Sequence, residues 1–156
     1  MTNPFPFTAG DVLNAADLNA IGETETWTPN FTAGVTVGNG TLSGTYQRVN
    51  DFVIVQGSFT LGSTSAVTGD ITVTVPITAS SLWDLANSTV VQFRDASLAN
   101  YWRGCGYPSG SNTVRIRALI RDGSNYVYAR AIGTMTPFTW AANDRIEWTA
   151  TYQVGA

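Results

Sequence analysis

Few side chains in this chain of 156 residues could do chemistry. Eleven residues are acidic, Cys105 is the single cysteine, and histidine is absent. Without histidine, the usual Ser-His-Asp and Cys-His arrangements for nucleophilic catalysis cannot form. A single cysteine excludes an intrachain disulfide, and with no histidine a Cys/His zinc site is excluded as well. We therefore expect no cofactor and no metal, and we interpret Cys105 as a small buried or half-buried residue.

A glycosidase needs two facing carboxylates, so this enzyme class must be weighed against the acidic positions. Asp51, Asp122 and Asp144 lie in expected turns, and Glu147 lies on the outer face of an expected strand. Turn chemistry and a solvated strand face account for these residues. The sequence has no clustered acidic loop of the EF-hand kind and no glycine-rich phosphate loop. We expect no catalytic residues and a protein that is not an enzyme.

The composition limits the partners. Only 12% of residues are charged, roughly half the usual share, so we expect other copies of the chain to cover much of its surface. The net charge of -3 gives no basic footprint for nucleic acid. No run of about 18 apolar residues predicts a membrane span. Residues 1–7 have neither the basic nor the apolar region of a signal peptide, so we expect synthesis in a cytoplasm.

From Trp27 onward, apolar and polar residues alternate with a period of two. Short threonine-rich strands punctuated by glycine predict a mostly β fold, an antiparallel sandwich or jelly roll, over residues 27–156. Asn50-Asp51 and Asp122-Gly123 are expected hairpin turns, and a helical turn is expected within residues 81–86. The residues expected to point into the core are Trp27, Val53, Val55, Phe59, Leu61, Ile71, Val73, Val75, Val91, Phe93, Val114, Ile116, Ala118, Ile120, Ile146, Trp148, Ala150 and Tyr152.

Residues 1–26 form a separate N-terminal arm. Two proline–phenylalanine pairs near its start predict an extended chain, because proline restricts its own backbone and that of the preceding residue. A short helix follows, with Asn14 as its N-cap, Leu18 and Ile21 on one face, and Gly22 at its end. About two turns are too few for a stable isolated helix. The helix must therefore dock on another surface.

Parts of the chain resemble a known group of phage proteins. The run FTAGDVLNAADLN, from Phe7 to Asn19, resembles the F-T-A-G-x-x-L-x-A-A-x-L-N opening of phage tail-fibre, minor tail and head-decoration proteins. The segments 27–46 and 137–152 are similar to the start and the end of the β domain that follows in those proteins. The resemblance implies a virion protein, made in the bacterial host cytoplasm, that attaches by its N-terminal segment and displays the β domain outward. It leaves open whether the protein belongs to the head or the tail.

The resemblance also implies an oligomer, and we expect a homotrimer bound to capsid or tail proteins of the phage. Because the chain has no fibre shaft, we expect a short decoration or appendage protein. In this interpretation apolar side chains of the arm are buried in the particle or in a neighbouring subunit, each contributing about 1.5–3 kcal/mol. The anchor residues are Phe5, Phe7, Leu13, Leu18 and Ile21.

The alternative function is a tail-associated receptor- or glycan-binding module for recognition of the host surface. Several aromatic residues could form a sugar-stacking surface, but we favour a place in the core or in a subunit interface, because aromatic residues dominate both environments. These residues are Tyr101, Trp102, Tyr107, Tyr126, Tyr128 and Trp140. Arg115 and Arg117 either pair with acidic residues of a neighbouring copy or lie on a solvated strand face.

Overall fold

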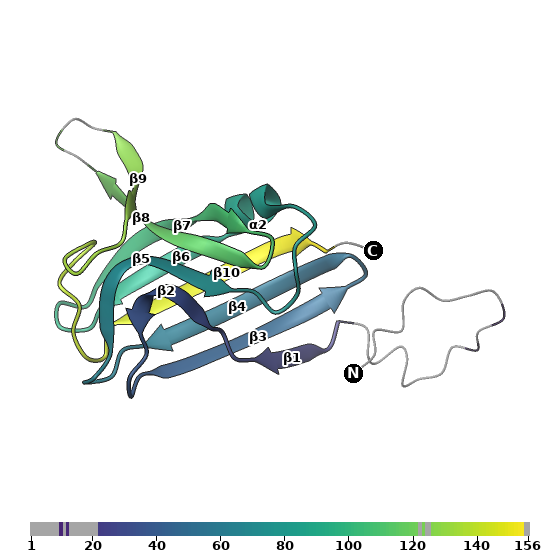
Figure 1. Cartoon of the computed structure of the whole chain (residues 1–156), viewed down its shortest axis with the longest axis horizontal. Coiled ribbons are helices and arrows are strands. Elements are labelled where there is room, and N and C mark those ends of the chain that lie inside the picture. Colours follow the sequence, from purple (N-terminus) through teal and green to yellow (C-terminus); the bar gives the residue numbers. More distant parts are fainter. Residues whose placement is uncertain (1–9, 11, 13–21, 122, 124–125, 155–156) are drawn as a thin grey trace.

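Ten strands form one antiparallel sheet in the computed structural model, which describes residues 10, 12, 22–121, 123 and 126–154. The strand order is β1-β3-β4-β10-β6-β7-β8-β5-β2, and β9 pairs with β8 (Figure 1). One helix, α2, is described. The elements are β1 (Thr24–Trp27), β2 (Phe31–Thr36), β3 (Thr41–Val49), β4 (Phe52–Thr60), β5 (Ala66–Thr74), α2 (Leu82–Ser88), β6 (Val90–Asp95), β7 (Asn100–Gly110), β8 (Thr113–Arg121), β9 (Val127–Ala131) and β10 (Arg145–Gln153).

The sheet curls so that β2 and β5 lie over β4 and β10 (Figure 1). Phe31 of β2 contacts Phe59 of β4, with 5.1 Å between the ring centroids, and Trp148 of β10, with 6.1 Å. The two halves of the curled sheet thus enclose one apolar core between their inner faces, as in a sandwich. The predicted mostly β, antiparallel, sandwich-like fold is confirmed.

The predicted alternation of inner and outer residues is also confirmed. Nearly all residues that the sequence pattern placed in the core are buried, including all four on the inner face of β10, whereas Trp27 and Ile120 are only partly buried. The hydroxyl of Tyr152 donates a hydrogen bond to the carbonyl oxygen of Ile77 at 2.8 Å. Burial raises the pKa of Tyr152 far above the ordinary value of a tyrosine. The hydrogen bond to Ile77 satisfies the Tyr152 hydroxyl inside the core, as buried polar groups require.

One cross-strand row of the inner face pairs indole rings with glycines. Trp27 lies opposite Gly44, Gly44 lies opposite Gly57, and Gly57 lies opposite Trp148. A Cβ atom at Gly44 would lie 2.4 Å from Nε1 of Trp27, and one at Gly57 would lie 2.2 Å from the Trp148 ring. The rings thus occupy the space that side chains would need. The main chain of β3 and β4 therefore lies closer to the two indole rings than any residue with a Cβ atom would allow.

The two predicted local elements within the described chain are present. Strands β3 and β4 are joined at Asn50-Asp51, and Asn50 has a φ of 54°, a left-handed conformation that asparagine tolerates well. The helical turn predicted within residues 81–86 is part of α2. The Ser81 hydroxyl accepts a hydrogen bond from the Asp84 amide at 3.4 Å and caps the helix.

The sheet begins earlier than the predicted domain boundary at Trp27. Strand β1 starts at Thr24, which lies opposite Gln47 of β3, and the Gln47 side chain donates a hydrogen bond to the Thr24 hydroxyl at 2.7 Å. Residues 24–26 therefore belong to the sheet. The predicted arm helix and all five anchor residues, Phe5, Phe7, Leu13, Leu18 and Ile21, lie outside the described residues.

We expect Gly57→Ala to destabilise the fold. The added methyl group would overlap the Trp148 ring, and such overpacking costs about 1–3 kcal/mol. Gly69→Ala in β5 is the matched control, because a Cβ atom there meets nothing within 4 Å, and its effect should stay within about 0.5 kcal/mol. Urea unfolding measures both. Equal stability of the two variants would show that a methyl group at position 57 fits beside the Trp148 ring.

Candidate functional site

A groove of about 420 Å³ crosses the outer face of the sheet over β3, β4, β10, β6 and β7. Its walls are two cross-strand rows of outward side chains, set side by side by the register of five neighbouring strands. The first row consists of Ser43, Ser58, Glu147, Gln92 and Arg103. The second row consists of Thr45, Gln56, Thr149 and Val90. The volume lies within the roughly 300–1,000 Å³ typical of ligand sites.

Main chain between the two rows forms the floor of the groove. It belongs to Gly44, Gly57, Trp148 and Val91, which line the groove although their side-chain positions face inward. Successive residues of a strand point to opposite faces, so this strip is the outer side of the glycine–tryptophan row. The same stretch of main chain thus contacts the core on one side and bounds the groove on the other.

Most polar side chains of the walls are free to bind a ligand. Within the part of the chain that the structure describes, they form no side-chain hydrogen bond to another residue. The exception is Glu147, which accepts a hydrogen bond from Nη1 of Arg145 at 3.2 Å. Serine and threonine hydroxyls and glutamine amides can each donate and accept. The free side chains are Ser43, Thr45, Gln56, Ser58, Gln92, Arg103 and Thr149.

The charges of the groove are unevenly distributed. Glu147 and Arg103 are its two charged side chains, and Arg145 already pairs with Glu147. Arg103, at the β7 end, makes no ion pair among the described residues and leaves this end positive. Glu147 is also the one carboxylate among the described lining residues, whereas glycoside hydrolysis normally uses two. This arrangement can hold a polar ligand, but it lacks the paired carboxylates of that reaction.

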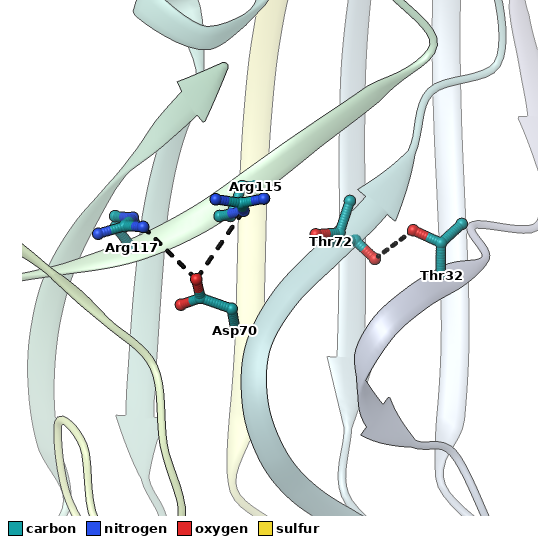
Figure 2. A network of polar contacts seen from close by, with 5 residues as sticks. All are labelled: Thr32, Asp70, Thr72, Arg115 and Arg117. Atoms are coloured by element: carbon teal, nitrogen blue, oxygen red, sulfur yellow. Dashed lines mark hydrogen bonds and ion pairs between the residues drawn. The ribbon is translucent and has the colours of Figure 1, made fainter. Parts of the chain in front are cut away.

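Arg115 and Arg117, which were expected either at a subunit interface or on a solvated strand face, are paired within the chain (Figure 2). Oδ2 of Asp70 on β5 lies 3.4 Å from Nη2 of Arg117 and 3.9 Å from Nε of Arg115, both on β8. The Arg117 guanidinium also lies over the ring of Tyr107, 4.6 Å from its centroid. One carboxylate therefore serves two guanidinium groups, and the outer face of β8 keeps a net positive charge.

The six aromatic residues predicted as a binding or interface group lie in three places. Trp102 and Trp140 are partly buried and contact Phe138, with ring centroids 4.7 and 4.5 Å apart. Two tyrosines are exposed on β7, and two are exposed on or next to β9, in the ribbon that projects from the body (Figure 1). The exposed residues are Tyr101, Tyr107, Tyr126 and Tyr128. No single stacking surface results from them.

Two aspartates at the ends of strands have structural roles. Asp144 is buried and accepts hydrogen bonds from the amides of Ala96, at 2.9 Å, and Ala141. Asp95 accepts a hydrogen bond from the hydroxyl of Ser97 at 2.6 Å, which lowers the pKa of Asp95. Both carboxylates hold loops in place. No group of three acidic, cysteine or histidine residues among the described residues could hold a metal ion.

Cys105 is half-buried at the edge of the groove. It lies opposite Val90, which lines the groove, and opposite Arg117 on the other side. Burial raises the pKa of the Cys105 thiol, and the positive charge of Arg117 partly opposes this effect. The thiol therefore remains protonated at neutral pH.

Comparison with other proteins gives no relative for this chain. No family model matches it, and no curated protein or solved structure is significantly similar. No helix among the described residues has the length and apolar character needed to cross a membrane. The groove was not predicted from the sequence, and the geometry of the sheet is its only support. Most of its walls are serine, threonine and glutamine side chains, which form no recognisable motif in the sequence and come together only through the strand register.

We expect the thiolate of Cys105 to form at a higher pH in the folded chain than in the unfolded chain. The pH profile of its alkylation by iodoacetamide should have a midpoint above the ordinary cysteine value of about 8.5. The urea-unfolded chain is the control. Arg117→Ala should move the midpoint further up, because it removes a nearby positive charge. A folded midpoint at or below that of the unfolded chain would contradict the assignment.

Proposed function

We propose that this chain is a non-enzymatic structural protein of a bacteriophage particle, anchored by its N-terminal arm and displaying its β domain outward. The observation that carries the proposal is that the described residues 24–154 form a continuous ten-stranded sheet around a buried apolar core. The core cluster runs from Val53 to Val154, and the partly buried residues packed against it begin at Trp27. In this proposal the arm binds a different surface, on the particle or on a neighbouring subunit.

An exposed apolar cluster lies where the arm enters the domain. Val49, Phe52 and Ile54 have exposed fractions of 45%, 50% and 44% at the joined ends of β3 and β4. A Cβ atom at Gly22 would lie 3.4 Å from Cγ2 of Val49, so the chain passes directly beside this cluster. Exposed apolar groups of this kind are typical of interaction surfaces. They support contact with a particle or a neighbouring subunit at this end.

The phage context is supported by the resemblance of residues 7–19 to phage attachment segments. The low share of charged residues supports an oligomer whose surface is partly covered, and a homotrimer is our proposal. The proposed partners are capsid or tail proteins, and the proposed location is the virion. The non-enzymatic part of the proposal is supported by the single, arginine-paired carboxylate in the groove.

The second candidate is a module that binds a receptor or glycan on the host surface. The observation that favours it is the groove on the outer face, with its free hydroxyl and amide groups. Display on a particle and recognition of a host are compatible. The arm would attach the protein to the particle, and the displayed β domain would bind the host surface.

Deleting residues 1–22 should leave a folded β domain that no longer attaches to particles. The ten described strands all lie downstream of these residues, from Thr24 to Gln153, so circular dichroism should show β structure and a cooperative melt. Particles assembled without the native copy should bind the full chain but not the truncated one. Phe5→Ala with Phe7→Ala should weaken attachment and spare the fold.

Light scattering of the full chain should give the mass of three copies. Truncated protein that still loads at full occupancy would place the attachment surface on the β domain instead. A non-cooperative melt of the truncated protein would show that the arm belongs to the core or to a subunit interface.

A further inference from the structure

We infer that the groove on the outer face binds an acidic oligosaccharide along its length, a polymer that carries carboxylate groups among its hydroxyls. The inference deepens the proposed display of this domain by naming a ligand for it, and its biological meaning rests on that display. The binding itself is a property of the isolated chain.

The hydrogen-bonding groups of the groove match those of a sugar. Each sugar hydroxyl both donates and accepts hydrogen bonds, so a sugar-binding site needs both hydrogen-bond donors and hydrogen-bond acceptors. Ser43 and Ser58 on one wall and Gln56 on the other provide these capacities, and none of the three is engaged by another described residue. A ligand therefore replaces water at these groups without breaking hydrogen bonds inside the protein.

The shape of the groove fits a narrow chain molecule. Five adjacent strands, from β3 to β7, contribute to it. With strands about 4.8 Å apart, it extends over roughly 19 Å, which exceeds a single sugar ring. The main-chain floor at Gly44 and Gly57 carries no outward side chain, so a ligand can lie directly on the sheet between the two rows.

The charge at the β7 end selects an acidic polymer. Arg103 lines the groove without an ion-pair partner among the described residues, and its planar guanidinium can hold a carboxylate in a bidentate manner. Arg117, in the adjacent row beyond Cys105, adds positive charge nearby. The one carboxylate of the groove, Glu147, is paired with Arg145 and repels a ligand less than a free carboxylate would.

A protein partner fits this groove less well. Protein interfaces depend on aromatic or large apolar anchors that become fully buried. Among the residues that line the groove, Val90 is the one exposed large apolar side chain, and Trp148 is only 2% exposed. The exposed tyrosines, which a protein would use, are not among the lining residues.

The test measures binding of the purified full chain to hexasaccharides by titration calorimetry. The probes are hexamers of galacturonate, of mannuronate and of guluronate, with a neutral glucose hexamer for comparison. We expect saturable binding of at least one uronate hexamer, weakening as salt rises, and weaker binding of the glucose hexamer.

Matched substitutions locate the site. Gln56→Ala removes a groove amide and should weaken binding about 3- to 10-fold, whereas Arg103→Ala should weaken it at least about tenfold and reduce the salt dependence. Gln153→Ala is the control, since Gln153 is equally outward on β10 but outside the groove, and it should change the affinity less than about twofold. Ser58→Tyr, which fills the groove from a partly exposed position, should abolish binding while circular dichroism shows the native sheet.

Absence of binding to every uronate hexamer at millimolar concentration would overturn the inference. Equal affinities of the Gln56→Ala and Gln153→Ala variants, or undiminished binding by Ser58→Tyr, would overturn it as well. A chain that loads on particles but binds no oligosaccharide would remove this inference and leave the proposed structural function intact. A chain that binds oligosaccharide but never attaches to particles would overturn the proposed structural function and leave this inference intact.

Discussion

The close approach of two indole rings to two glycines is the packing constraint on which this structure depends. Trp27 covers Gly44 and Trp148 covers Gly57, in one row that crosses β1, β3, β4 and β10. Each ring fills the space of a missing side chain, so large aromatic surfaces are buried without thickening the core. On the opposite side the same main chain is the floor of a groove between two polar rows. The glycine–tryptophan row and the candidate ligand surface therefore share three residues, Gly44, Gly57 and Trp148.

The low number of charged residues determines which side chains cover the outer face of the sheet. With few ionised groups, the groove walls on the central strands consist mostly of hydroxyl and amide side chains, which form no side-chain hydrogen bonds within the described chain. Four of the eight arginines lie on β7 and β8. Asp70 balances only part of the charge of Arg115 and Arg117. Along the groove, the outer face thus changes from mostly hydroxyl and amide side chains over β3 and β4 to a positive charge at β7 and β8.

Much of the core could be predicted from the sequence, because β4 and β10 are half-buried strands with strict alternation. Strand β2 was harder to predict: it pairs with β5 through register shifts, and Gly34 has a φ of 80°. The aromatic residues could not be sorted by type alone. Tyr101 and Trp102 are neighbours in sequence, yet one is exposed on the outer face and the other packs against the core.

The groove could not be predicted because its walls join residues from distant strands. β10, the last strand, inserts between β4 and β6. Only this order places Glu147 beside both Ser58 and Gln92. Outward positions of each strand could be read from the alternation, but their neighbours depend on a sheet order that local patterns do not encode.

A crystal of the protein soaked with the tightest-binding uronate hexasaccharide would locate the ligand on the sheet. We expect sugar density across β3, β4, β10 and β6, lying on the main chain of Gly44 and Gly57, with a carboxylate within hydrogen-bond distance of Arg103. Sugar density on the exposed tyrosines of β7 or β9, with only water in the groove, would show that the groove is not the binding site.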